Sequence, residues 1–152
     1  DKDCVCAPAQ IQRYLAKISG PLLDRIDLHV EVTPVPFEEL ASRGDGEKST
    51  SIRDRVIEAR ERQMKRFESH PGIYSNAMMP PQMVRRICTI DKPSASLLEV
   101  AMKKLDLSAR AYDRILKVSR TIADLADSES IQAEHIAEAI QYRSLDRESW
   151  GG

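Results

Sequence analysis

The stretch LSARAYDRILKV, at residues 107–118, decides the fold class of this chain. Ser108 suits a helix N-cap, because its side-chain oxygen can accept a hydrogen bond from a free N–H of the first turn. After it, apolar residues recur every three or four positions and so share one helical face. These residues are Ala111, Tyr112, Ile115, Leu116, Ile122 and Ala123. The pattern predicts an amphipathic helix that needs other helices to cover it.

Similar periodicity on both sides of this stretch predicts further helices. They are expected over residues 94–105 and 132–142, with a short helix over 81–88 and a long charged helix over 49–67. The long helix carries a narrow stripe that runs through Ile52, Val56, Ala59, Gln63 and Arg66. Hydrophobic residues make up 41% of the 152-residue chain and aromatic residues only 5%, so the core must rest on aliphatic side chains and Met. We expect a mostly α-helical bundle.

The first 36 residues differ from the rest. Residues 8–18 predict a short amphipathic helix, and residues 22–26 predict another helical turn. Residues 27–32 then alternate, with Leu28, Val30 and Val32 on one face, which predicts a β-strand ended by the prolines that follow. A lone strand leaves its backbone N–H and C=O groups unpaired. We therefore expect its sheet in a part of the protein outside this chain.

Charge and composition narrow the function classes. With 23 basic and 24 acidic residues, the net charge is −1, so contact with nucleic acid would need a local basic patch. No apolar run approaches the roughly 20 residues that cross a bilayer, and we expect no membrane partner. The chain begins DKDC, without Met or a signal-peptide pattern, which suggests a piece of a longer protein.

The cysteines are few and odd in number: Cys4, Cys6 and Cys88. This argues against a secreted disulfide framework and fits the reducing cytoplasm. Cys4 and Cys6 could form half of a tetrahedral zinc site, but a second pair of ligands is needed and the only other cysteine is the distant Cys88. Two ordinary reduced cysteines are the favoured interpretation, and we expect no metal site within the chain itself.

Several stretches together resemble one family. They are GPLLDRIDL at 20–28 followed by HVEV at 29–32, ARERQ at 59–63, SNAM at 75–78, the stretch at 107–118, and AIQYR at 139–143. Their order resembles the C-terminal portion of magnesium-chelatase-like AAA+ ATPases of the ComM group. The resemblance implies the tail end of an AAA+ core at 1–36, an insertion helix and linker at 37–93, and a C-terminal helical lid at 94–152. It also implies a homo-hexameric parent protein that works on DNA by branch migration.

The resemblance assigns Arg25 as an arginine finger that acts on the nucleotide of a neighbouring subunit, with Asp24 beside it at the interface. A permanently charged, planar donor suits the charge that develops on a transferred γ-phosphoryl group. The alternative is a surface arginine paired with Asp24 or Asp27.

The resemblance also implies a sensor-2 arginine in the lid, which contacts an ATP phosphate. Arg110 is the leading candidate, because it lies in the first turn after Ser108, where free N–H groups and the helix dipole favour an anion. Arg114, one turn later, is a rival for the same role. Either arginine could instead decorate an exposed helix face.

The long charged helix offers a candidate DNA patch at Arg60, Arg62 and Arg66. Basic side chains on one helix can neutralise phosphates without reading sequence. The favoured alternative is a solvated helix with ion pairs four residues apart, such as Glu58–Arg62 and Glu61–Lys65.

The chain carries no G-x-x-x-x-G-K-[ST] loop to bind phosphates and no strand that ends in an acidic pair to hold Mg²⁺. ATP and Mg²⁺ are therefore expected only in the full-length parent, on its own upstream AAA+ core. Two other functions stay open: a chelatase-type chaperone for metal insertion, and a regulatory module with no motor role.

Overall fold

The computed structural model describes residues 5–30, 32, 34–38 and 46–143. These residues are mostly helical, as predicted. The elements, in chain order, are α1 (Pro8–Leu15), α2 (Gly20–Leu23), α4 (Ser49–Phe67), the 3₁₀ helix η1 (Asn76–Met78), α5 (Pro81–Ile87), α6 (Lys92–Lys104), α7 (Ala109–Leu125) and α8 (Ala133–Gln141).

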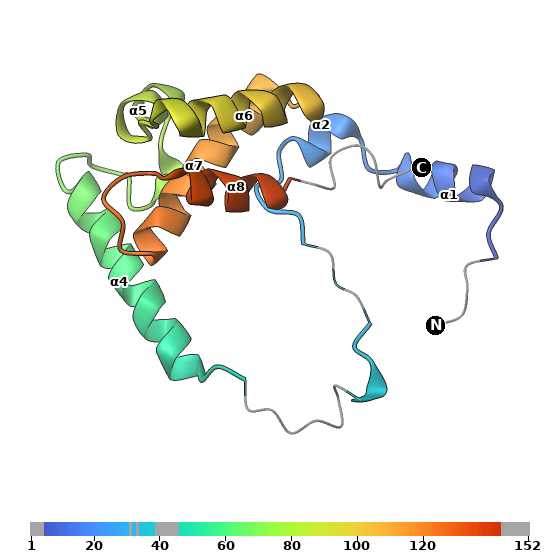
Figure 1. The fold of residues 1–152 in the computed structure, drawn as a ribbon, viewed down its shortest axis with the longest axis horizontal. Coiled ribbons are helices and arrows are strands. Elements are labelled where there is room, and N and C mark those ends of the chain that lie inside the picture. The colour runs from blue at the N-terminus through green and yellow to red at the C-terminus, as the bar shows by residue number, and fades with distance from the viewer. Residues whose placement is uncertain (1–4, 31, 33, 39–45, 144–152) are drawn as a thin grey trace.

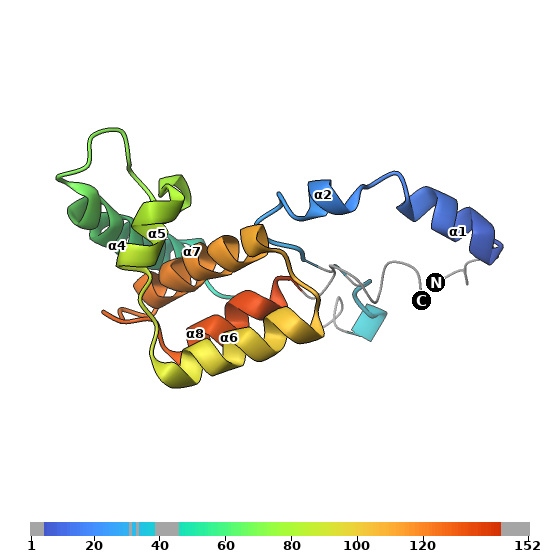
Figure 2. The ribbon, with the colours of Figure 1, turned by 90° about the horizontal axis from the view of Figure 1, so that it is seen from above.

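Helix α7 is the centre of the bundle. It packs against α4, η1, α5 and α8, and α6 packs against α8; Figures 1 and 2 show α7 crossing between α4 and the α6–α8 pair. The Ser108 cap is confirmed, because its hydroxyl oxygen accepts a 3.2 Å hydrogen bond from the Ala111 N–H. The core that α7 shares with its neighbours consists of Phe67, Met79, Met83, Val84, Cys88, Leu98, Ile115, Leu116, Ala123, Ile131, Ile136 and Ala139.

Helix α6 begins earlier than its hydrophobic pattern suggests. The pattern predicts a start at Ser94, but the helix begins at Lys92. Asp91 caps it: one carboxylate oxygen accepts a 2.9 Å hydrogen bond from the Ser94 N–H. Hydrogen bonding from Ser94, by its side chain first and then by its backbone N–H, lowers the pKa of the Asp91 carboxyl group. The helix can begin before Ser94 because Pro93 lies in its first turn, where a backbone nitrogen needs no hydrogen-bond partner.

Helix α4 has the predicted bounds, but only its second half is covered. Its buried residues are Ala59, Gln63 and Phe67. Ile52 and Val56, which the predicted stripe includes, are each 42% exposed. The reason is that α7 ends at Leu125, so the first half of α4 projects beyond the bundle (Figure 1).

The segment before α4 is less closely packed. Helix α1 lies apart from the bundle in both views (Figures 1 and 2). The strand expected over 27–32 is not formed at residues 27–30 or at Val32, and Glu31 lies outside the described residues. A strand needs a ladder along its length, whereas here the His29 N–H donates one 2.9 Å hydrogen bond to the Tyr142 carbonyl oxygen. Within the described residues, no helix combines the length and apolar character that spanning a membrane requires.

Candidate anion-binding cleft

A cleft of about 460 Å³ brings together side chains from three distant segments. They come from the loop after α2, from η1 and from the first half of α7. The lining residues are Arg25, Asp27, Ala77, Arg110, Asp113, Arg114 and Lys117. Four cationic side chains face two carboxylates, so the cleft carries an excess of positive charge. The arrangement therefore suits an anion with several charges.

Helix α7 positions most of these charges. Arg110, Arg114 and Lys117 are spaced by four and three residues, so they lie on one face of the helix. Arg110 is exposed in the first turn, and its side chain makes no hydrogen bond or ion pair with any other described residue. Because free N–H groups at a helix start also attract anions, Arg110 is the cation best placed to meet an incoming phosphate.

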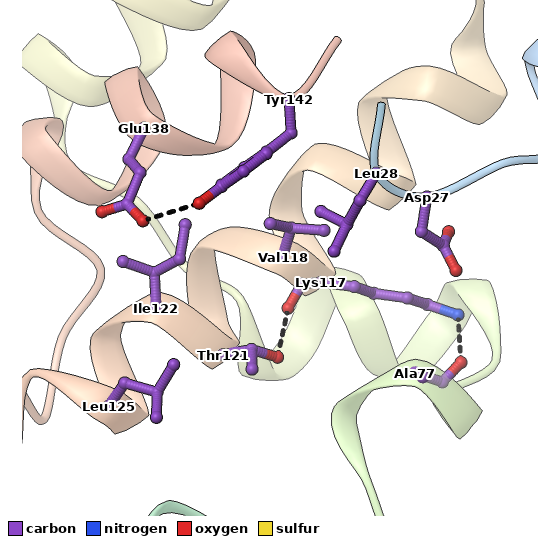
Figure 3. A pocket seen from close by; sticks show the side chains of 10 residues that line it. All are labelled: Asp27, Leu28, Ala77, Lys117, Val118, Thr121, Ile122, Leu125, Glu138 and Tyr142. Atoms are coloured by element: carbon purple, nitrogen blue, oxygen red, sulfur yellow. Dashed lines mark hydrogen bonds between the residues drawn. The ribbon is translucent and has the colours of Figure 1, made fainter. Parts of the chain in front are cut away.

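The other two cations of this face already have protein partners. Arg114 forms an ion pair with Asp27, with side chains that are 28% and 53% exposed respectively. The Lys117 ammonium group donates a 2.9 Å hydrogen bond to the Ala77 carbonyl oxygen (Figure 3). Partial burial lowers the pKa of Lys117, and the nearby charge of Arg114 lowers it further. An anion would have to compete with Asp27 for Arg114.

Arg25 enters the cleft from the loop after α2. Its side chain is exposed, and its guanidinium donates a 2.9 Å hydrogen bond to the Pro21 carbonyl oxygen. The structure gives both neighbouring carboxylates other partners: Asp27 pairs with Arg114, and Asp24 lies 3.9 Å from the buried guanidinium of Arg143. Neither carboxylate therefore neutralises the charge of Arg25, which lines the cleft. Its role as a finger stays a prediction, as does the place of Asp24 at an interface.

The proposed DNA patch has a different geometry from that of the cleft. Arg60 is exposed, whereas the Arg62 and Arg66 side chains are 31% and 21% exposed and turn toward the end of α7. Arg62 pairs with Asp127 at 2.5 Å, and Glu58 lies 3.9 Å away, as the alternative interpretation predicts; the Glu61–Lys65 pair that it also predicts is not formed between these two described residues. DNA binding by this helix stays a prediction, and Arg60 is the one of the three whose charge faces solvent.

Arg66 belongs to a buried network centred on Asp124. Asp124 is fully buried and accepts hydrogen bonds from Arg66 at 2.5 and 2.8 Å, from Asn76 at 2.8 Å and from Arg120 at 3.2 Å. Arg120 also donates to the carbonyl oxygens of Ser128 and Glu129. Burial lowers the pKa of Arg120. The network joins α4, η1 and α7, and only its Arg120–Asp124 pair, four residues apart on α7, has a spacing that is visible in the sequence.

An apolar hollow of about 320 Å³ adjoins the cleft. Asp27, Ala77 and Lys117 line both spaces. Figure 3 shows the Leu28 side chain lying over Val118 at the wall of the hollow. Leu28, three residues after Arg25, therefore packs the loop that carries Arg25 against α7.

Neither described cysteine lines the cleft. Cys6 is exposed and Cys88 is buried, while Cys4 lies outside the described residues. Burial raises the pKa of the Cys88 thiol to about 11. Within the part of the chain that the structure describes, no three His, Cys, Asp or Glu residues gather as metal ligands.

Two family models match the chain. Residues 46–143, about two thirds of it, match the magnesium chelatase subunit ChlI C-terminal family, and residues 1–40 match the magnesium chelatase subunit ChlI family. The chain is 46% identical over 142 residues to the competence protein ComM of Haemophilus influenzae, 42% identical over 144 residues to the uncharacterised protein YifB of Escherichia coli, and 37% identical over 142 residues to an uncharacterised protein of Mycobacterium tuberculosis. Each match covers 93% of this chain but only 27–28% of the relative. The chain therefore belongs to the magnesium-chelatase-like family of ComM and YifB, within which residues 46–143 form the ChlI C-terminal domain.

Proposed function

We propose that this chain is the C-terminal lid and sensor portion of a longer bacterial AAA+ ATPase, and that it supplies arginines for ATP hydrolysis. The observation that carries the proposal is the shared cleft of Arg25, Arg110 and Arg114. Arg25 and Arg110 are 85 positions apart in the sequence, yet they line one positively charged space. Phosphoryl transfer relies on such cations, since its catalysis consists mainly of positioning and charge stabilisation.

The roles of the arginines follow from their partners. Arg25 acts as the arginine finger, because its charge is not neutralised by Asp24 or Asp27. Arg110 acts as the sensor-2 residue in preference to Arg114, whose guanidinium is held by Asp27. Release of Arg114 toward a phosphate would require the Asp27 pair to break first.

The cleft supplies cations but lacks the other half of an ATP site. The sequence contains no phosphate-binding loop, so the nucleotide and its Mg²⁺ must sit on an upstream AAA+ core. Because Arg25 and Arg110 face the same space, they address one nucleotide together. In a homo-hexamer, a finger that reaches the neighbour's ATP therefore brings the sensor-2 arginine of its own chain to that same ATP.

We further propose that the complete protein is a cytoplasmic DNA branch-migration motor. Similarity to the competence protein ComM supports this choice. The alternative is a chaperone for metal insertion, which the name of the matching chelatase family favours. Fold and family do not settle a substrate, so ATPase activity should be measured with and without forked DNA. Stimulation supports the motor, and a rate that ignores DNA contradicts it.

The central test is Arg25→Ala in the full-length protein. Turnover should fall by roughly 10³-fold or more, while ATP binding stays nearly unchanged, because the finger contributes mainly in the transition state. Arg85→Ala, which removes an exposed arginine of α5 outside the cleft, is the matched control and should keep wild-type turnover.

Mixed oligomers sharpen this test. Subunits with Arg25→Ala, combined with subunits that lack the phosphate-binding loop, should regain partial activity at interfaces where an intact loop meets an intact finger. If Arg25→Ala leaves turnover unchanged, or weakens ATP binding and hydrolysis equally, the finger role is wrong.

A further inference from the structure

The loop that carries Arg25 is fastened to the end of α8. Arg143, two residues after that helix, donates a hydrogen bond to the Ile26 carbonyl oxygen and lies 3.9 Å from the Asp24 carboxylate. Its neighbour Tyr142 accepts a 2.9 Å hydrogen bond from the His29 N–H. Asp24 and Ile26, the two Arg143 partners named here, therefore stand directly before and directly after Arg25 in the chain.

The Arg143 side chain is held in place by burial. It is only 1% exposed, which is unusual for an arginine, and among the described residues it is the largest fully buried side chain. Helix α8 packs against α7, and its residues Ile136 and Ala139 are at most 1% exposed. Arg143 thus connects the Arg25 loop to the same rigid bundle that presents Arg110.

Few other contacts hold this loop. Leu22, Ile26 and Leu28 remain 40–48% exposed, so burial of apolar side chains anchors it weakly. The Asp27–Arg114 pair is partly exposed, and ion pairs of that kind contribute little. The Arg143 guanidinium, with one hydrogen bond after Arg25 and one ion pair before it, is therefore a strong constraint on the direction of this loop, together with the buried His29.

We infer that Arg143 is a positioning residue for Arg25: it sets the direction of the arginine finger without touching the nucleotide. This inference rests on the proposed role of Arg25 in ATP hydrolysis. A planar guanidinium can bind the Ile26 carbonyl and the Asp24 carboxylate together, whereas the single ammonium of lysine lacks this fixed fork. A displacement of about 1 Å at a reacting centre can cost roughly 10²-fold in rate.

The test compares Arg143→Lys with Arg120→Lys in the full-length ATPase. Both replace a buried arginine, 1% and 3% exposed, by a residue of the same charge. Arg143→Lys should lower kcat by roughly 10²-fold and leave KM for ATP unchanged, since the finger contributes mainly in the transition state. Arg120→Lys disturbs the Asp124 network instead, so it should lower the melting temperature and keep kcat per folded molecule.

Coupling to Arg25 separates positioning from a general structural effect. Adding Arg143→Lys to Arg25→Ala should cost no further turnover, because the side chain that it positions is already gone. Independent, multiplying losses would overturn the inference. Asp24→Asn, at a side chain that is 24% exposed, tests the same contact if Arg143→Lys does not fold, and it should also lower kcat without raising KM.

The positioning role of Arg143 and the proposed function of Arg25 predict different outcomes. If Arg25→Ala abolishes turnover but Arg143→Lys and Asp24→Asn keep it, the positioning role is wrong and the proposed function stands. If Arg25→Ala itself has no effect on turnover, the proposed function is wrong and the positioning role falls with it.

Discussion

Replacing Asp124 by asparagine should cost this chain about 3 kcal/mol of its free energy of unfolding. Asp124 is fully buried and accepts hydrogen bonds from Arg66, Arg120 and Asn76. The substitution keeps the side-chain shape but removes the charge, and it turns an amide N–H₂ group toward donors. Loss of one partner from a buried pair typically costs about 3–5 kcal/mol, and we take the low end because the Arg66 side chain is 21% exposed.

Urea denaturation at pH 7, followed by circular dichroism at 222 nm, measures this cost. With an m-value of about 1–3 kcal/mol/M, the midpoint should fall by roughly 1–3 M. The matched control is Asp127→Asn, the same chemical change just after the same helix. The Asp127 side chain is 79% exposed in its pair with Arg62, and asparagine tolerates its φ of 55°, so this variant should lose less than about 1 kcal/mol. Equal losses in the two variants would refute the assignment of Asp124 as the centre of a buried network.

Two further predictions concern the chain in isolation. Raising the pH from 9 toward 11 should lower its stability, because the unfolded thiol of Cys88 releases its proton near 9.0 while the folded thiol keeps it to about 11. Urea midpoints across this range should fall less in Cys88→Ala than in the unchanged chain. The same dependence of the midpoint on pH in both proteins would contradict the raised pKa. Saturating ATP should stabilise the chain by less than about 1 kcal/mol and should not be hydrolysed, since the cleft provides cations without a phosphate-binding loop; a larger thermal shift or measurable phosphate release would show a more complete site.

The helical bundle could be predicted because its signals are local. Ser108 stands three residues before the N–H that it caps, and the stripe that follows has helical spacing. The same local patterns did not predict which parts of a helix face are covered by neighbouring helices. Ile52 and Val56 share a stripe with buried residues, but burial depends on where α7 ends. Residues 27–32 alternate like a strand, yet a ladder requires partners that periodicity does not reveal.

The site could be predicted only in part, for a similar reason. Arg25, Arg110 and Arg114 were singled out from the family resemblance, and the structure brings all three to one cleft. Lys117 shares that cleft and was missed, although its spacing from Arg110 and Arg114 on one helix face would have pointed to it. Arg143 and Asp124 were also missed. Arg120 lies four residues before Asp124 on the same helix, but the other partners named here, Arg66 and Asn76 for Asp124 and Ile26 for Arg143, lie far away in sequence, and only packing reveals contacts of that kind.

Helix α7 holds its cleft residues near its start and its buried network near its end. Arg110 and Asp124 are roughly 21 Å apart along the axis, at about 1.5 Å per residue. Changes at sites so far apart usually add without coupling, which makes the two ends separately tunable. Natural variation or engineering can therefore adjust how the first turn handles an anion without eroding the thermal tolerance that the last turn provides, and stabilising changes near Asp124 leave the chemistry at Arg110 free to diverge.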